Sequence, residues 1–446
     1  MSLRIAWAGP WNERSAIATF GIPVVAALAR AGHQVDILRT ETGDFLRISE
    51  PVLPPGGHGT VHILSEDTPE RIRASYDIVI ANVGNHFGFH GALMAFHDKL
   101  SPIVIFHDFF LGDFCAGWAD QFPDPELRLR AIVHAIYGAA SMPEDKPFWL
   151  SRGEMTQLRP MIDLFTSGAV GAVVHADHYL DHVRRRCPGP VTKIPLSYSD
   201  LGVPPVRDGD RLVVGTVGDI NSNKQAAEVI AGIGASADLR DRCDYLLIGN
   251  IDTHQRQHLA ALAQTHGVRS ITFTGWVDDQ RLRTLLGGVD VICCLRFPIL
   301  EGGSASLIMA MLAGRPVLVS DHGCYGEVPD DCVMKCCPGA EAGDVTRHLT
   351  ALLADRTLGR CIGARARAYA ADVHSPARYA RDLLGLIGQS LAVAPALRTG
   401  YSFGHLLASF GLDSDDPAAQ RVARILTNLL IPPDSAMASR QEHPYP

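Results

Sequence analysis

The sequence lacks the features that mark membrane, secreted and nucleic-acid-binding proteins. Its 446 residues contain no apolar run of about 18, the length needed to cross a bilayer. The opening residues, MSLRIAWAG, do not show the charged, apolar and small-residue progression of a signal peptide. The formal net charge is −8, whereas nucleic-acid-binding domains are usually basic. We therefore expect a cytoplasmic protein with no nucleic-acid partner and at most a peripheral contact at the inner membrane surface.

The cysteines also lack the spacings of a disulfide framework or a zinc site. Among the ten, Cys293-Cys294 and Cys336-Cys337 are adjacent pairs, and adjacent cysteines rarely bridge each other. Cys332 and Cys336 are not separated by the two residues of a zinc knuckle. We expect reduced thiols, no metal site and no cofactor.

Two successive series of strand-like and helix-like segments fill most of the chain. Strand-like apolar runs lie at 3–8, 35–38, 77–81, 102–106, 169–174 and 191–196, and then at 211–217, 244–248, 271–274, 290–293 and 316–320. Continuous apolar runs are typical of parallel strands covered on both faces. The pattern predicts an α/β protein with two Rossmann-like, doubly wound domains that face each other across a cleft.

The domain boundaries follow from composition. The segment 199–210 is rich in Pro, Gly and Asp and is typical of a linker, here a hinge for cleft closure. We expect an N-terminal domain at 1–200 and a C-terminal domain at 211–376. Residues 377–446 predict helices near 377–391 and 417–430 that return to the N-terminal domain, followed by a disordered tail.

The strongest local signal for chemistry lies in the second series, within 290–330. A strand ends near Cys294, the following loop contains Glu301-Gly302-Gly303-Ser304, and a helix starts at about Ala305. Small residues at a helix N-terminus leave backbone N–H groups free to hold a phosphate. Ser304 is also a good N-cap, so a merely capped helix is the alternative.

A second polar loop, from Gly218 to Lys224, follows the predicted strand at 211–217. Lys224 then stands at the start of a predicted helix, where its ammonium group could neutralise a phosphate. Lysine at a helix start is also a common surface feature, so this loop is a weak signal by itself.

A third group of polar residues follows two strands of the first series. Asn85 and His90 come after one strand, and His107 and Asp108 come directly after the next. Side chains in these places emerge at the carboxyl ends of parallel strands, where α/β proteins bind ligands. Each histidine could instead be a satisfied structural residue.

Together these segments resemble the retaining GT-B glycosyltransferases of family four. The family pattern E-G-(small)…A-x-x-x-G-x-P-V is matched by Glu301, Gly302, Ala310, Gly314, Pro316 and Val317. A subgroup carries a G-N…H element, a strand-H-D element and an L-R-x-P..E..S element. Their counterparts here are Gly84-Asn85…His90, His107-Asp108 and Leu295-Arg296-Phe297-Pro298…Glu301…Ser304.

The resemblance implies an activity and a set of roles. It implies transfer of a hexosyl-type sugar from a UDP, GDP or dTDP-type donor to a glycan, lipid-linked or small-molecule acceptor. Configuration would be retained and no metal would be needed. Glu301 and His107 would act at the reacting sugar, and Asn85, His90 and Asp108 would line the sugar or acceptor pocket. The donor nucleotide would be held by Lys224, Gly218, Gly302, Gly303, Ser304, Arg296, Trp276 and Val277.

Two positions depart from the family pattern. Met309 stands where many members have a second glutamate for the ribose, and Asp219 stands where an arginine often follows the glycine. One cation of the usual pair is then either missing or supplied from elsewhere, by Arg296 or Arg315. These departures keep open a non-catalytic nucleotide-sugar-binding or scaffolding protein, and a sugar-nucleotide epimerase of the same fold is another alternative. A Rossmann oxidoreductase is disfavoured, because the first turn, Gly9-Pro10-Trp11-Asn12, is not G-x-G-x-x-G.

Overall fold

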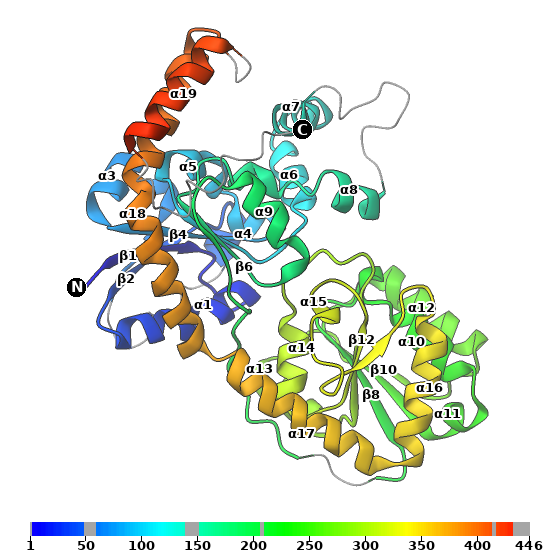
Figure 1. Ribbon diagram of the computed structural model, residues 1–446. Coiled ribbons are helices and arrows are strands. Elements are labelled where there is room, and N and C mark those ends of the chain that lie inside the picture. Colours follow the sequence, from blue (N-terminus) through cyan, green and yellow to red (C-terminus); the bar gives the residue numbers. More distant parts are fainter. Residues whose placement is uncertain (1, 49–58, 139–150, 206–208, 413–415, 431–446) are drawn as a thin grey trace. The chain divides into compact units, whose positions relative to one another are not determined.

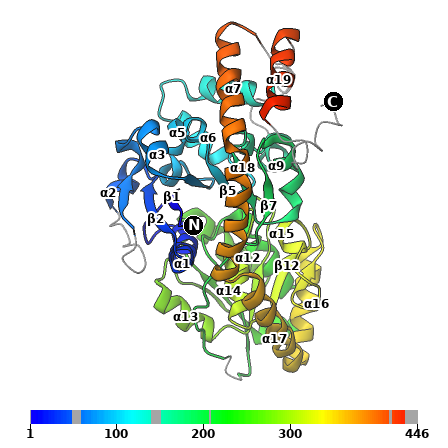
Figure 2. The same ribbon diagram turned by 60° about the vertical axis from the view of Figure 1, so that its left-hand side comes forward.

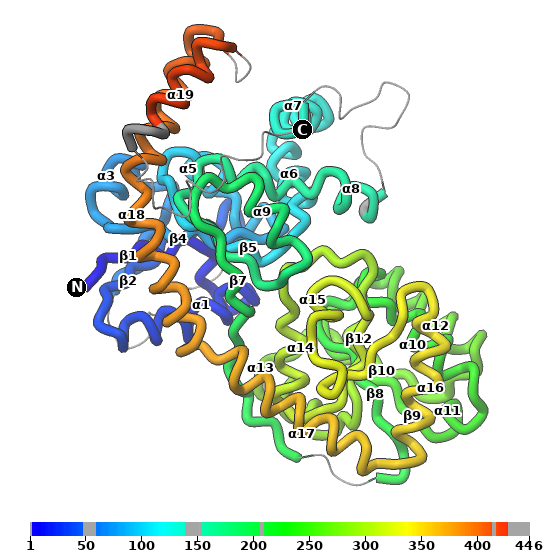
Figure 3. The backbone as a smooth tube through the Cα atoms, in the orientation of Figure 1, coloured from blue at the N-terminus to red at the C-terminus, as the bar shows by residue number. Residues whose placement is uncertain are grey.

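The computed structural model describes residues 2–48, 59–138, 151–205, 209–412 and 416–430. Contacts divide the chain into two units: unit 1 comprises Met1–Ile194 with Tyr379–Pro446, and unit 2 comprises Pro195–Arg378. Figure 3 shows the chain running through unit 1, then unit 2, and returning to unit 1 along α18 (Pro376–Ser409). The tail that the sequence predicts to be disordered lies outside the described residues.

Unit 1 is built on a seven-stranded parallel sheet in the order β3-β2-β1-β4-β5-β6-β7. The strand order reverses between β1 and β4, which defines the switch point of a doubly wound sheet. Every residue of β4 and β5 is buried, as expected for central strands covered on both faces. The strands are β1 (Arg4–Gly9), β2 (Gln34–Arg39), β3 (Val61–Ile63), β4 (Ile78–Val83), β5 (Ile103–Phe106), β6 (Gly171–Val174) and β7 (Val191–Lys193).

Helices cover both faces of the unit 1 sheet (Figure 1). They are α1 (Ala16–Arg30), α2 (Asp44–Ile48), α3 (Pro69–Ser75), α4 (Phe87–His90), α5 (Leu93–Leu100), α6 (Gly112–Ala119), α7 (Pro125–Tyr137), α8 (Arg152–Leu158), α9 (Leu180–Arg186), α18 and α19 (Pro417–Leu430), with short 3-10 turns η2 (Leu64–Glu66), η4 (Ile162–Phe165) and η5 (Asp177–Tyr179).

The long C-terminal helix α18 packs on the unit 1 sheet. A Cβ at Gly171 would lie 2.3 Å from the Ser390 hydroxyl, so α18 approaches β6 where that strand has no side chain. The sequence predicts a helix near 377–391, but α18 continues to Ser409 and contains Pro395. Figures 1 and 2 show α19 beside the distal part of α18.

Unit 2 contains a six-stranded parallel sheet in the order β10-β9-β8-β11-β12-β13. Its switch point lies between β8 and β11. The strands are β8 (Leu212–Val217), β9 (Cys243–Ile248), β10 (Ile271–Phe273), β11 (Val291–Cys294), β12 (Val317–Ser320) and β13 (Met334–Cys336).

The helices of unit 2 bury an apolar core against this sheet. In Figure 1, α10, α11, α12 and α16 lie on one face and α13, α14 and α17 on the other. The helical elements are η6 (Ser222–Lys224), α10 (Ala226–Gly234), α11 (Ala237–Arg242), α12 (Thr253–Thr265), α13 (Asp279–Gly287), α14 (Ala305–Leu312), α15 (Gly323–Gly326), α16 (Glu341–Ala354) and α17 (Arg356–Val373).

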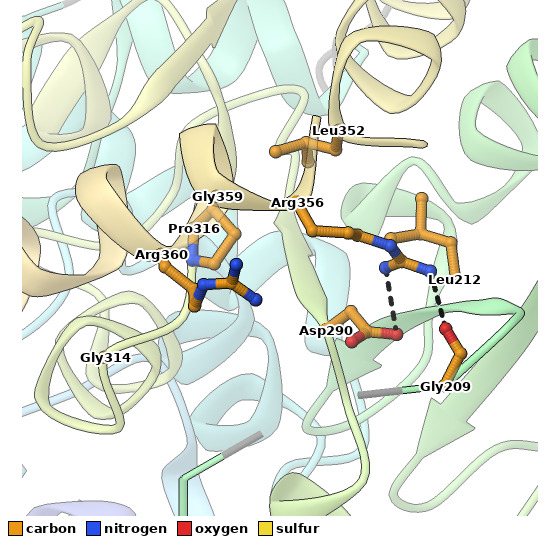
Figure 4. A pocket seen from close by; sticks show the side chains of 9 residues that line it. All are labelled: Gly209, Leu212, Asp290, Gly314, Pro316, Leu352, Arg356, Gly359 and Arg360. Atoms are coloured by element: carbon orange, nitrogen blue, oxygen red, sulfur yellow. Dashed lines mark hydrogen bonds and ion pairs between the residues drawn. The ribbon is translucent and has the colours of Figure 1, made fainter. Parts of the chain in front are cut away.

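Arginines of unit 2 hold the segment that the sequence predicts to be a linker. Arg315 donates to the carbonyl oxygen of Pro204 at 2.7 Å, and Arg367 pairs with Asp200 at 2.9 Å. Figure 4 shows Arg356 between Asp290 and Gly209, beside a small pocket. This pocket lies at the amino-terminal ends of β8, β11 and β12, the edge opposite the one where parallel sheets bind ligands.

Candidate functional site

The loops that follow β8 and β11 meet at the switch point of unit 2. The two strands are neighbours in the sheet, and the amide of Phe297 donates to the carbonyl oxygen of Asn223 at 3.0 Å. The Asn223 side chain donates in return to the carbonyl oxygen of Pro298. The two predicted ligand loops therefore form one continuous surface that carries Lys224 and Glu301.

Lys224 is a buried cation with few partners. Its side chain turns back to the end of β8, where Nζ donates to the carbonyl oxygen of Val217 at 2.8 Å. Within the described residues this is its one hydrogen bond, although an ammonium group has three donors. Gly218 makes room for it, because a Cβ there would lie 2.9 Å from Nζ, and its φ of +104° favours glycine.

The environment of Lys224 opposes its positive charge. Burial, followed by the nearby Arg296, lowers the pKa of Lys224 to about 7, while Glu301 acts in the opposite direction. An anion brought to this ammonium group would restore the charged form.

Glu301 is held by two side chains. Its Oε1 accepts from Arg296 Nε at 2.9 Å and from the Tyr325 hydroxyl at 2.5 Å, and Oε2 accepts from the Leu300 amide at 3.3 Å. Burial raises the pKa of Glu301, but Arg296 and Tyr325 outweigh burial and hold the pKa below its usual value. Glu301 is therefore a carboxylate at neutral pH, with 19% of its side chain exposed.

The start of α14 adds backbone donors beside this carboxylate. Ser304 is the N-cap and accepts from the Leu307 amide at 3.3 Å, and Ile308 donates to the Ser304 carbonyl. The amides of residues 302–306 precede that first helical hydrogen bond. Arg296 Nη2 reaches Ser306 at 3.4 Å, so the guanidinium group ties the helix start to Glu301. Gly302, Gly303 and Ser304 are thus brought together with Arg296.

The same edge of the sheet continues away from Lys224 to Trp276. A Cβ at Gly249 would lie 2.1 Å from the carbonyl oxygen of Gly218, and Gly249 forms an isolated bridge with Gly275. Trp276 follows Gly275 and is 72% exposed, with the half-buried Val277 after it. The loops after β8, β9 and β10 therefore form a row along the carboxyl edge, with an exposed indole near its end.

In unit 1, His107 follows β5 and is buried inside a neutral hydrogen-bond network. Its Nε2 lies 3.1 Å from Asn82 Oδ1, and its Nδ1 lies 3.4 Å from His175 Nε2. Asn82 donates its amide group to the carbonyl oxygen of Ala8, so its Oδ1 is the atom that faces His107 and must accept. Burial, then His175 and His90, lower the pKa of His107 well below its usual value.

The other predicted residues of unit 1 lie close by. Asp108 Oδ2 accepts from the Asn85 amide at 2.7 Å. The Asn85 side chain accepts from the amides of Asp113 and Phe114, at the start of α6. His90 is 1% exposed and faces the carbonyl oxygen of Asn82 at 3.0 Å, and burial lowers its pKa to about 3. Asn85 therefore caps a helix, and His90 is a neutral buried ring.

The structure also corrects one expectation and adds residues that sequence reasoning missed. Arg315 is wrong as a second cation of the Lys224 loop, because it bonds Pro204 and Leu286 at the opposite edge. Arg296 does lie beside Lys224. Tyr325 was missed because its sequence separation from Glu301 gives no local signal. His175 could have been found, because it follows β6 as directly as His107 follows β5.

Residues 211–355 match the family model described as "Glycosyl transferases group 1". Many solved structures resemble this chain, and several of them cover most of it. Sucrose-phosphate synthase from Thermosynechococcus elongatus has a TM-score of 0.60 and 17% identity, covering 87% of this chain and 99% of that one. The fold is GT-B. HepE from Anabaena, in complex with UDP and glucose, has a TM-score of 0.59 and 14% identity, covering 86% and 99%.

WaaG, a glycosyltransferase involved in lipopolysaccharide biosynthesis, has a TM-score of 0.54 and 15% identity, covering 85% of this chain and 99% of that one. No curated protein sequence matches the chain. At these identities the likeness establishes the two-domain α/β fold, and the family match in unit 2 supports glycosyl transfer as the activity.

Two further observations concern the described parts of the chain alone. Every helix there is too short or too polar to cross a lipid bilayer. Those residues also contain no group of three or more His, Cys, Asp or Glu side chains arranged to hold a metal ion.

Proposed function

We propose that this protein transfers a hexosyl-type sugar from a nucleotide-sugar donor to a glycan, lipid-linked or small-molecule acceptor, with retention of configuration and without a metal. The observation that carries the proposal is the buried ammonium group of Lys224. Within the described residues it has one acceptor for three donors, and it lies beside the second cation, Arg296. The two cations are buried, Glu301 is the one described carboxylate bonded to either of them, and the other nearby carboxylate, Asp219, is exposed, so an anion would complete the site.

The donor diphosphate suits this site. Lys224 and the amides of residues 302–306 supply donors from the loops after β8 and β11, which meet at the switch point. Charge that builds on the leaving diphosphate is stabilised by fixed donors of this kind. One HepE structure holds UDP and glucose and another holds UDP-glucose, which supports a donor of the UDP, GDP or dTDP type here.

The nucleoside and sugar then extend in opposite directions from the phosphates. Toward Trp276, the row of loops offers an exposed aromatic ring and backbone groups at Val277 for the base. Toward Glu301, a carboxylate already fixed by Arg296 can accept a sugar hydroxyl. Met309 stands where many members of the family have a glutamate that binds the ribose, and its side chain is buried in α14. Other groups would therefore have to recognise the ribose.

We assign the sugar and acceptor side to unit 1. Asp108 and the neutral rings of His107 and His90 gather near the carboxyl ends of its central strands, where hydrogen-bonding side chains suit sugar hydroxyls. Asn85 contributes by fixing the start of α6 and the position of Asp108. His107 is the residue we expect to act on the reacting sugar from this side.

A donor panel tests the proposal. Purified protein is incubated with UDP, GDP, dTDP and ADP sugars, measuring thermal shift and release of nucleoside diphosphate with and without sugar acceptors. We expect one base to stabilise the protein and its sugar nucleotide to be consumed. Stabilisation without consumption across acceptors would support the non-catalytic alternative. A change in the donor sugar without release would support the epimerase, and no stabilisation by any nucleotide would contradict the proposal.

A further inference from the structure

Glu301 Oε1 is the meeting point of two donors that come from different elements. Arg296 lies in the loop after β11, while Tyr325 lies in α15, beyond β12. Glu301 itself belongs to a loop with two glycines directly after it, a composition that does not restrict the backbone. The position of the carboxylate is therefore set by its side-chain partners.

Tyr325 is well suited to fix a carboxylate. The ring is fully buried, and the Arg296 guanidinium carbon lies 5.7 Å from its centre. Burial keeps the pKa of Tyr325 well above its usual value, so the hydroxyl stays protonated and donates to Glu301. Its 2.5 Å distance is that of a hydrogen bond to an ionised acceptor.

The two oxygens of the Glu301 carboxylate have different hydrogen-bond partners. Oε1 has two strong side-chain donors, whereas Oε2 accepts only a long bond from the Leu300 amide among the hydrogen bonds of the described residues, and the carboxylate also interacts with its own backbone amide. A carboxylate has about four lone-pair positions. Oε2 is therefore the oxygen with positions left for a ligand hydroxyl, and its direction depends on how firmly Oε1 is held.

We propose that Tyr325 is a positioning residue for Glu301: its hydroxyl fixes Oε1 so that Oε2 is aimed at the sugar of the donor. This inference rests on the proposed function of the site. It assigns Tyr325 no contact with the substrate. Tyr325 acts through Glu301 alone, which separates it from a residue that only supports the core.

The test is a double-mutant cycle with Tyr325→Phe and Glu301→Gln. The phenylalanine keeps the ring and removes only the hydroxyl. With UDP-glucose as the donor probe, we expect Tyr325→Phe to lower kcat about tenfold, as expected for one lost hydrogen bond to a charged group. UDP binding should be unchanged, and the acid limb of the kcat profile should move to higher pH because Glu301 loses a stabilising donor. In the Glu301→Gln background the same substitution should have little further effect.

Tyr245→Phe is the matched control. Tyr245 is also fully buried in unit 2, and its hydroxyl bonds Thr216 at 2.9 Å within the sheet, so this variant removes an equivalent buried hydroxyl elsewhere. We expect it to leave kcat and the pH profile unchanged.

Three results would overturn the inference. The first is that Tyr325→Phe leaves both kcat and the acid limb of the pH profile of kcat unchanged, while Glu301→Gln strongly lowers kcat. In that case the proposed function would stand and the positioning role would fall. Another is an equal loss in both backgrounds, which would show that Tyr325 acts independently of Glu301. If Glu301→Gln had normal turnover, the catalytic role of Glu301 and the role of Tyr325 would fail together, while UDP binding would still report on the phosphate site.

Discussion

The carboxyl edges of the two sheets both gather buried polar side chains, yet they balance charge differently. In unit 1, Arg39 pairs with Glu41 at 3.1 Å, and burial holds the rings of His90 and His107 neutral. In unit 2, two cations, Lys224 and Arg296, share one carboxylate.

That difference separates two kinds of ligand chemistry on one protein. The neutral histidine rings of unit 1 can each donate or accept a single hydrogen bond, which suits the hydroxyl groups of a sugar. A buried excess of positive charge is costly until an anion arrives, which suits a diphosphate. The two edges should therefore respond differently to mutation: changes in unit 2 should affect charge and catalysis, and changes in unit 1 should affect sugar-stage steps and stability.

The largest effect is expected at Glu301. Glu301→Gln keeps an acceptor for Arg296 and avoids leaving that buried guanidinium unpaired, so the variant should fold. Losing the charge that stabilises the reacting sugar should lower turnover by about a hundredfold or more. Steady-state kinetics on folded protein measure this, and near-normal turnover would remove Glu301 from the chemistry.

A smaller effect, confined to the sugar stage, is expected for His107. His107→Ala should lower transfer about tenfold, the value of one hydrogen bond lost in the reacting complex, and leave UDP affinity nearly unchanged. Kinetic measurements give the effect on transfer, and calorimetry on the same variant gives the effect on UDP affinity. Loss of UDP binding in a folded variant would contradict the division of roles, and no change in either would make His107 purely structural.

The pH dependence of UDP binding should reveal the charge of Lys224. Its pKa is about 7 in the free protein, and a bound diphosphate raises it because an opposite charge favours the ammonium form. Affinity should therefore fall as pH rises above 7, by up to about tenfold per pH unit. Calorimetry from pH 6.5 to pH 9 measures this, with Lys224→Met as the control in which the fall is lost. If UDP affinity fell with pH in the same way in the wild type and in Lys224→Met, Lys224 would not be the group that binds the diphosphate.

The smallest effect is expected at Asn85, whose side chain caps α6. Asn85→Ala should lower the free energy of unfolding of unit 1 by about 1 kcal/mol, as loss of a helix cap typically does. Denaturant unfolding measures this. A change in UDP affinity with unaltered stability would instead indicate that Asn85 belongs to the phosphate side.

The sequence allows the fold to be predicted because central parallel strands are continuous apolar runs. The run at 244–248 corresponds to β9 (Cys243–Ile248), and the run at 102–106 to β5 (Ile103–Phe106). Two of the four edge strands were missed, β3 (Val61–Ile63) and β13 (Met334–Cys336), each only three residues long. The helix predicted near 377–391 continues in the structure to Ser409, through Pro395, a residue that normally interrupts a helix.

The site could be predicted only as far as its residues stand in local motifs. Glu301 and Lys224 lie in loops directly after strands, where the pattern points to them. The partners that fix them come from elsewhere: Tyr325 reaches Glu301 from beyond β12, and Asn223 joins the two loops through Pro298. Such contacts depend on the three-dimensional path of the chain, which hydrophobic periodicity does not encode.

The most direct test of the account is a calorimetric titration of UDP into the wild-type protein and Lys224→Met, with Lys193→Met as a control in unit 1. Methionine fills the buried space of Lys224 without its charge, so the fold should persist. Lys193 belongs to unit 1, where it pairs with Asp177. We predict that Lys224→Met weakens UDP binding by about 1–3 kcal/mol, the loss of a charged hydrogen bond, while Lys193→Met binds UDP as the wild type does. Equal affinity for UDP in all three proteins would contradict the claim that the buried charge of unit 2 holds the donor diphosphate.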